Sequence, residues 1–251
     1  MQQIKNNRIL ILADIHSNNI ALQEVLGDIS KRGYENSKII VNGDVISLGP
    51  CPQECFELLS EFNDISFILG NNDRYIINRN FANMDNFHAD MYKQVPQGLR
   101  DNLTWTYNQL SPENLEKMKK WPKQIVFKVS KYYMSVSHGT PEDDEENINS
   151  DISDQDLVRR FNEYDLYVFS HTHVPFVRKI NDKMFINPGS VGSSLDGDRR
   201  ASYAILTLNN DKWEVKIHRI SYDLNKVVDL MNNREVPWRK SILKILFKAS
   251  F

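Results

Sequence analysis

The stretch RILILADIHSNN, residues 8–19, is an apolar run that ends abruptly in polar residues. The run, Arg8 to Ala13, has the length and composition of a buried β-strand, and the polar turn from Asp14 to Asn19 follows it directly. Apolar side chains then recur at helical spacing from Ile20 to Ile29. A strand that leads through a polar turn into an amphipathic helix is the repeating unit of α/β sheets. This stretch therefore predicts an α/β protein.

Two more strands of the same kind follow. Residues 38–41 and 65–69 are short apolar runs, and residues 53–61 between them carry a helical pattern. Parallel strands that are buried on both faces have continuous apolar runs rather than alternating ones. The N-terminal part of the chain is therefore predicted to form a sheet with parallel strands.

The rest of the chain divides into a helical stretch, a second set of strands and a tail. Residues 74–121 are polar and helical, best at 102–110 and 112–118, and we expect a helical insertion over or beside the functional site. Short strand patterns return after Pro122 and predict a second sheet with antiparallel parts. They lie at 124–129, 132–137, 166–170, 174–179, 184–186, 203–208 and 213–220. Residues 222–251 are predicted to form a helical tail, and because no linker divides the chain, residues 1–251 are expected to form one domain.

Composition and charge argue against several classes of protein. The 251 residues have a net charge of −2 and a sequence pI of about 6.3, without the basic excess by which proteins bind long nucleic acids. The early apolar run ends at Asp14 and is too short for a signal peptide or a membrane span, so we expect a cytoplasmic protein without a membrane partner. Cys51 and Cys55 lack a second pair of ligands for a zinc site and are given no function. Residues 141–156 contain eight acidic residues and no lysine or arginine, and are predicted to form a solvated loop.

Residues that can bind a metal ion follow five of the predicted strands. They are Asp14-Ile15-His16, Gly43-Asp44, Gly70-Asn71-Asn72-Asp73, His138-Gly139 and His171-Thr172-His173. Because the carboxyl ends of neighbouring strands converge on one crevice, we expect these side chains to lie together. Three carboxylate or amide groups and four imidazoles are seven donors, and since one divalent ion takes about four to six, the set predicts two ions that share a carboxylate. The other two histidines, His88 and His218, are expected to be structural or exposed.

The chemistry of these donors indicates the metal and the reaction. Nitrogen and oxygen ligands without thiolate suit Mn²⁺, which we expect, and also iron, Zn²⁺, Co²⁺ or Ni²⁺. Two ions roughly 3.5–4 Å apart are the usual means of hydrolysing phosphate esters. A water between them becomes hydroxide near neutral pH and attacks phosphorus in line with the leaving group, while the ions neutralise the phosphate oxygens.

These five segments occur in the same order in the calcineurin-like metallophosphoesterases, which the sequence resembles from Ile9 to about Leu208. Residues 48–52, 111–115, 186–192 and 196–204 are similar to a bacterial and archaeal branch of predicted phosphodiesterases. The resemblance implies a four-layer αββα sandwich, with two mixed β-sheets inside, helices outside and a dimetal site at one end. It also implies ligands, namely Asp14, His16 and His173 for the first ion, Asn71, His138 and His171 for the second, and Asp44 as the bridge. Residues 187–192 are expected to form a tight turn that positions the His171-x-His173 segment.

The sequence departs from the family pattern at Asn72, directly after a predicted ligand. Many members have a histidine there that protonates the leaving oxygen, whereas asparagine donates a hydrogen bond but cannot act as an acid. A general acid contributes roughly 10²–10⁴-fold in rate, so Asn72 favours activated or diester substrates. Arg74 and Arg200 are expected either to clamp phosphate oxygens, because a guanidinium suits bidentate contacts, or to form surface ion pairs.

We therefore expect a dimetal phosphoesterase that hydrolyses a small phosphodiester or nucleotide. The alternative among enzymes is a phosphomonoesterase, including a protein Ser/Thr phosphatase or a dinucleoside tetraphosphate hydrolase, and the absence of a histidine at Asn72 counts against it. A binding module of the same fold is a further alternative, against which the complete ligand set counts. The sequence contains no marker of oligomeric state. The shape of the pocket depends on how the insertion, the acidic loop and the chain end meet.

Overall fold

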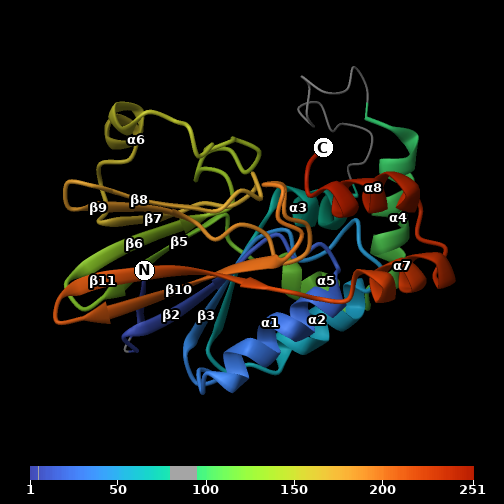
Figure 1. The fold of residues 1–251 in the computed structure, drawn as a ribbon, viewed down its shortest axis with the longest axis horizontal. Helices are drawn as coiled ribbons and strands as arrows, with labels where there is room; N and C mark the ends of the chain where they lie inside the picture. Colours follow the sequence, from blue (N-terminus) through green and yellow to red (C-terminus); the bar gives the residue numbers. More distant parts are fainter. Residues whose placement is uncertain (5, 80–94) are drawn as a thin grey trace.

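The computed structural model describes residues 1–4, 6–79 and 95–251, and Figure 1 shows two β-sheets stacked face to face. The first sheet consists, in spatial order, of β11 (Lys212–Ile220), β10 (Ala201–Asn209), β2 (Arg8–Leu12), β3 (Lys38–Asn42) and β4 (Ile65–Ile68). Strands β2, β3 and β4 are parallel to one another, and β10 is antiparallel to both β2 and β11. The parallel strands are the three that the apolar runs predicted.

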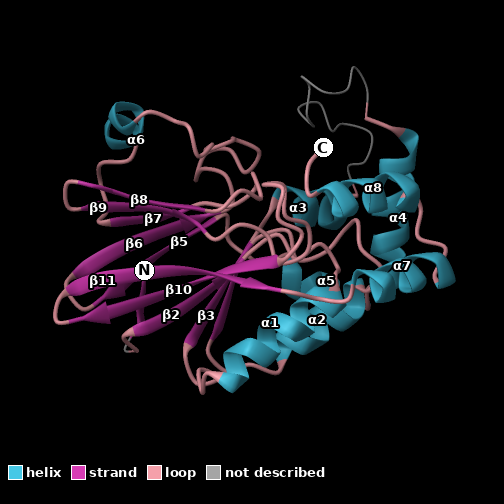
Figure 2. Cartoon of the chain, viewed as in Figure 1, coloured by secondary structure: helices cyan, strands magenta, loops and turns pink. Residues whose placement is uncertain are grey.

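The second sheet is also mixed. In spatial order it consists of β1 (Gln2–Ile4), β5 (Gln124–Val129), β6 (Tyr132–Ser137), β7 (Leu166–Val168), β9 (Lys183–Asn187) and β8 (Phe176–Ile180). Strand β7 is parallel to β6 and β9, while the pairs β5–β6 and β8–β9 are antiparallel. The predicted α/β sandwich of two mixed sheets is therefore confirmed, and Figure 2 shows how the strands and helices separate in space.

The alternation of side chains along β2 shows how the layers pack. Ile9 and Ile11 point into the space between the sheets and join the core that contains Phe127, whereas Leu10 and Leu12 join the core beneath the helices. Helices α1 (Asn19–Lys31) and α2 (Pro52–Ser60) cover this outer face of the first sheet (Figure 1). Full burial of one such aliphatic side chain contributes about 1.5–3 kcal/mol to folding.

The outer layer over the second sheet is thin. Leu157 of α6 (Asp154–Arg160) and the following Phe161 pack on aromatic side chains of that sheet, including Tyr167 and Phe185. The solvated loop predicted for residues 141–156 is therefore wrong at its C-terminal end. Ser153 caps a helix there, because its side chain accepts a hydrogen bond from the backbone N–H of Asp156.

Helices gather at the end of the sheets where the strands β2, β3 and β4 finish (Figure 1). They are α3 (Asn71–Asn78), α4 (Gln97–Gln109), α5 (Pro112–Met118), α7 (Leu224–Asn233) and α8 (Arg239–Lys248). Part of the helical insertion expected at 74–121, with His88, lies outside the described residues. In the described part of the chain, no helix is both long and apolar enough to cross a membrane.

Candidate metal centre

The five segments singled out from the sequence come together at the strand ends. Asp14 follows β2, Asp44 follows β3, and Asn71 is the first residue of α3, which follows β4. His138 comes directly after β6, and His171 and His173 follow β7. All of the predicted ligands are buried except His171, which is partly exposed. The topology thus brings segments that lie more than 150 residues apart in the sequence into one cluster.

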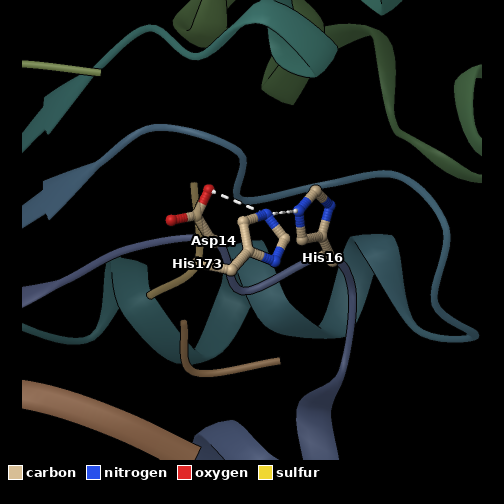
Figure 3. Close-up of side chains that lie close together, drawn as sticks. All are labelled: Asp14, His16 and His173. Carbon is tan, nitrogen blue, oxygen red and sulfur yellow. Dashed lines mark hydrogen bonds and ion pairs between the residues drawn. The ribbon is translucent and has the colours of Figure 1, made fainter. Parts of the chain in front are cut away.

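One group of side chains contains Asp14, His16 and His173 (Figure 3). The Nε2 atoms of His16 and His173 are 3.1 Å apart, and Nε2 of His173 is 3.4 Å from Oδ1 of Asp14. Neither carboxylate oxygen of Asp14 has a hydrogen-bond partner, although the residue is fully buried. A buried carboxylate without a partner is unfavourable unless a cation neutralises it.

A second group forms around Asn71. Its side-chain oxygen is 3.1 Å from Nε2 of His138 and 3.1 Å from Nδ1 of His171. Two imidazole nitrogens and one amide oxygen that point to the same place are suitable ligands for a divalent ion. These are the three residues that the family resemblance assigned to the second ion.

The carboxylate of Asp44 lies between the two groups. Its Oδ2 atom is 3.7 Å from Nε2 of His16 in the first group and 3.6 Å from Nε2 of His138 in the second. Asp14 also reaches the second group, since its Oδ1 atom is 3.8 Å from Nε2 of His138. The sequence assigned Asp14 to one ion alone, but the geometry lets both carboxylates connect the groups.

Hydrogen bonds on the far side of the rings orient the imidazoles. The Nδ1–H of His138 donates to the carbonyl of Asn42 at 2.9 Å, and that of His173 donates to the carbonyl of Ser193 at 2.5 Å. Because a carbonyl oxygen only accepts, these bonds fix the proton on Nδ1 and leave Nε2 of the neutral ring free to bind a metal. The Nδ1 atom of His16 is 3.1 Å from the hydroxyl of Ser47.

Burial and mutual proximity shift the ionisation of these groups in opposite directions. Burial raises the pKa of Asp14 well above its usual range and lowers the pKa of His16 to about 4. Burial also lowers the pKa of His138, but the charges of Asp44 and Asp14 outweigh it and raise that pKa to about 10. Burial lowers the pKa of His173 well below its usual range. Divalent cations fit this site, because they would bind the neutral imidazoles of His16 and His173, displace the proton from His138 and compensate the buried carboxylates.

The backbone adopts a left-handed conformation at most of the predicted ligands. The φ angles are 51° at Asp14, 47° at His16, 51° at Asp44, 66° at His171 and 58° at His173. Such conformations cost of order 1–3 kcal/mol each at non-glycine residues and cluster at functional sites. Gly43 also has a positive φ, 80°, and a Cβ atom there would lie 2.4 Å from Nδ1 of His138. Only glycine therefore fits beside this imidazole.

Asp73 supports the centre, although the sequence did not assign it a separate role. Its carboxylate accepts hydrogen bonds from the backbone N–H groups of Val45, Ile46 and Gly70, at 3.1–3.2 Å. These bonds tie the turn that carries Asp44 to the start of α3. The sequence could have indicated this role, because Asp73 lies three residues after Gly70, which is the position of the acidic residue in a capping box.

Residues 187–192 hold the two ends of the centre together. The side-chain NH₂ of Asn187 donates to the carbonyl of Ser170 at 3.0 Å, and the backbone N–H of Gly192 donates to the carbonyl of Asp14 at 3.0 Å. A Cβ atom at Gly192 would lie 1.9 Å from the carbonyl oxygen of Ile15, so the two segments touch backbone to backbone. The positioning role predicted for this segment is confirmed.

Asn72 lies at the centre, whereas the two arginines do not. The side-chain NH₂ of Asn72 donates to Oδ2 of Asp44 at 2.6 Å, and its backbone N–H donates to Oδ1 at 2.9 Å. Arg74 binds the carboxylates of Asp144 and Glu145 at 2.7–2.8 Å.

Arg200 binds Asp198, and its side chain is 51% exposed. Neither Arg74 nor Arg200 lines the cavity beside the predicted ligands, and both are in ion pairs. Asp144, only 5% exposed, also corrects the solvated loop, because it is buried by its pairing with Arg74.

A cavity of about 290 Å³ opens beside the predicted ligands. His16, Asp44, Asn71, His171 and His173 form its polar end together with Asn72. Its apolar wall comes from three parts of the chain, with Leu48 from the Asp44 turn, Leu195, and Trp238, Ile245 and Phe251 from the C-terminal segment. The acidic loop contributes Asn147 and Asn149. The loop and the chain end thus both shape the pocket, as the sequence indicated.

Similarity to known proteins defines the class of protein to which this fold and site belong. The structure resembles the crystal structure of a metallophosphoesterase from Sphaerobacter thermophilus, with a TM-score of 0.76, 28% identity, and coverage of 98% of this chain and 100% of that one. A hypothetical protein from Pyrococcus horikoshii has the same fold, with a TM-score of 0.82, 22% identity, and coverage of 97% of this chain and 98% of that one.

Sequence similarity shows the family to which the chain belongs. Residues 8–211 match the calcineurin-like phosphoesterase superfamily domain. An uncharacterized protein from Methanocaldococcus jannaschii is 32% identical in an alignment 248 positions long, which covers 92% of this chain and 94% of that protein. The chain therefore belongs to the calcineurin-like phosphoesterases, a metallophosphoesterase family that uses divalent metals.

Proposed function

We propose that the protein is a two-metal phosphodiesterase that acts on a small phosphodiester or nucleotide. The position of Asp44 carries this proposal, because its carboxylate lies between two groups of donors. A shared carboxylate is what a pair of ions needs in order to act on one phosphate. Trp238 and Ile245, near the end of the chain, line the same cavity, which supports treating residues 1–251 as one functional unit.

We assign the ligands in two sets, as the family resemblance implied. Asp14, His16 and His173 would hold one ion, Asn71, His138 and His171 would hold the other, and Asp44 would join them. Mn²⁺ suits this mixture of nitrogen and oxygen donors, as do iron, Zn²⁺, Co²⁺ and Ni²⁺. The bound ions would activate water as the nucleophile and neutralise the phosphate oxygens.

The other groups at the centre orient and do not transfer protons. Asn72 holds the carboxylate of Asp44 through two hydrogen bonds. Among the described residues that line the cavity, the imidazoles are those of His16, His171 and His173, all of them proposed ligands. The described lining therefore offers a leaving group no dedicated acid, which favours diesters and activated esters over alkyl monoesters.

The first experiment compares two chromogenic esters with the same leaving group. We expect the Mn²⁺-loaded protein to hydrolyse bis-p-nitrophenyl phosphate faster than p-nitrophenyl phosphate, and Asp44→Asn to lose this activity. Asp229→Asn makes the same chemical change at an exposed residue of α7 and should retain full activity. Faster monoester turnover would support the phosphomonoesterase alternative. Protein that contains two metals and hydrolyses neither ester would support the binding module.

A further inference from the structure

Part of the lining of the cavity beside the proposed ligands is an apolar wall. It is formed by Leu48, which follows the Asp44 turn, by Leu195, and by Trp238, Ile245 and Phe251 in the C-terminal segment. None of the described residues that line the cavity is a lysine or an arginine. Among the described lining residues, the positive charge that attracts a phosphate would therefore come from the bound metal ions alone.

The indole of Trp238 is held in a specific place. Trp238 precedes α8 with a φ of 63°, a left-handed conformation that directs the chain into the helix. A Cβ atom at Gly98 of α4 would lie 2.5 Å from Cδ1 of the indole. The absence of a side chain at Gly98 therefore makes room for this ring against α4.

Asn102, on α4, forms hydrogen bonds to two of the segments that make up the wall. Its side chain is fully buried, and its oxygen accepts a hydrogen bond from the backbone N–H of Leu48 at 2.9 Å. Its NH₂ group donates to the carbonyl of Pro237, next to Trp238, at 3.2 Å. Arg234 adds a hydrogen bond to the carbonyl of Pro50 at 3.0 Å. The wall is thus built into the fold before any ligand binds.

We propose that Leu48, Trp238 and Ile245 form the subsite for an uncharged apolar or aromatic group esterified to the phosphate. This proposal rests on the phosphodiesterase function proposed above and names its substrate class, a monoanionic diester with one such group. An aromatic ring gains free energy by covering this wall, whereas a charged group there would lose hydration without finding a cation. The cavity, about 290 Å³, is at the small end for ligand sites, and it has room for one ring-sized group beside the phosphate.

The test measures equilibrium binding of three probes to the metal-loaded, full-length protein by ligand-observed NMR. Dimethyl phosphate and methyl phenyl phosphate have the same charge, and methyl 4-carboxyphenyl phosphate adds a carboxylate to the ring. We expect methyl phenyl phosphate to bind about tenfold tighter or more than dimethyl phosphate, because the ring buries apolar area. We expect the carboxylated probe to lose most of this advantage.

Variants locate the preference on the wall. Trp238→Ala and Ile245→Ala should each reduce the preference for the phenyl probe by about threefold or more, because each removes apolar contact area. Leu243→Ala is the matched control, since Leu243 lies on the same helix but does not line the cavity. Ile245→Lys places a cation in the wall and should make the carboxylated probe the tighter of the two ring probes. Ile245 is half-buried, so this variant does not place the charge in a closed core.

The outcomes separate the two proposals. Equal binding of the phenyl and methyl probes by protein that hydrolyses bis-p-nitrophenyl phosphate would overturn the subsite and leave the proposed function intact. An unchanged probe order in Ile245→Lys would also overturn the subsite. Failure to bind metal and to hydrolyse either chromogenic ester would instead contradict the proposed function.

Discussion

Replacement of Asn102 by alanine should destabilise the protein mainly through the two shorter of its three side-chain hydrogen bonds; the third, to the carbonyl of Leu48, is 3.4 Å long. The variant leaves the backbone N–H of Leu48 and the carbonyl of Pro237 without the partners that they have at 2.9 and 3.2 Å. Loss of a partner costs about 1–3 kcal/mol for each buried polar group. Both groups are only partly buried and can gain some water, so we expect a loss of about 2–4 kcal/mol in the free energy of unfolding.

Urea unfolding at a fixed metal concentration measures this loss. Thr104→Ala is the control, because Thr104 is exposed on the same helix and its hydroxyl bonds only to the carbonyl of Arg100. A surface change of this kind falls within about 0.5 kcal/mol of the wild type. A loss below about 1 kcal/mol in Asn102→Ala would show that solvent replaces both bonds and that α4 does not fasten the wall.

Three further predictions concern the metal centre. Asp44→Asn should weaken both ions together, whereas His173→Ala should chiefly empty the first site; metal analysis that finds only the second ion lost in His173→Ala would reverse our assignment. Removal of metal by a chelator should lower the unfolding temperature, because ions at about 100 times their dissociation constant stabilise by about 2.7 kcal/mol per site; no change by calorimetry would mean that the folded state binds no ion. Asn72→His should speed monoesters with poor leaving groups, by up to about 10²-fold if the imidazole can act as an acid. Its ratio of phenyl phosphate to bis-p-nitrophenyl phosphate turnover should rise, and an unchanged ratio would contradict the proton-donor argument.

The sequence predicted the strands other than β1 well, because each apolar run ends where the chain turns; β1 (Gln2–Ile4) has no such run and was missed. The bounds of β5 and β6 are those predicted, and β2 is one residue shorter than its apolar run. Helix α3 begins three residues before the helical stretch predicted from residue 74, because its first turn consists of Asn71, Asn72 and Asp73 and has no apolar face. Helix α4 begins at Gln97, earlier than the predicted 102, since Gly98 weakens a helical pattern. Gly98 is explained by the structure, because the indole of Trp238 packs in the space that a side chain at position 98 would occupy.

Contacts between distant residues account for what the sequence could not predict at the site. The carboxyl ends of neighbouring parallel strands meet at one edge of a sheet. The position of each predicted ligand directly after a strand was therefore enough to predict that the ligands lie together. No local pattern could show that Arg74 pairs with Asp144, seventy positions further along the chain. For the same reason, the tail was predicted to be helical, but its place along the cavity followed only from tertiary contacts such as that between Asn102 and Pro237.

The chemistry and the proposed specificity come from different parts of the chain. Every proposed metal ligand lies within residues 8–211, the part that matches the calcineurin-like phosphoesterase superfamily domain. Trp238 and Ile245 lie beyond residue 211, yet they form the wall that the ester group of a substrate would contact. Membership of the superfamily therefore implies metal-dependent phosphoesterase chemistry but does not imply this apolar wall. If the wall selects the ester group as proposed, a relative that differs at these two positions would keep the same centre and accept a different ester group, and the substrate would follow from the C-terminal segment rather than from the family.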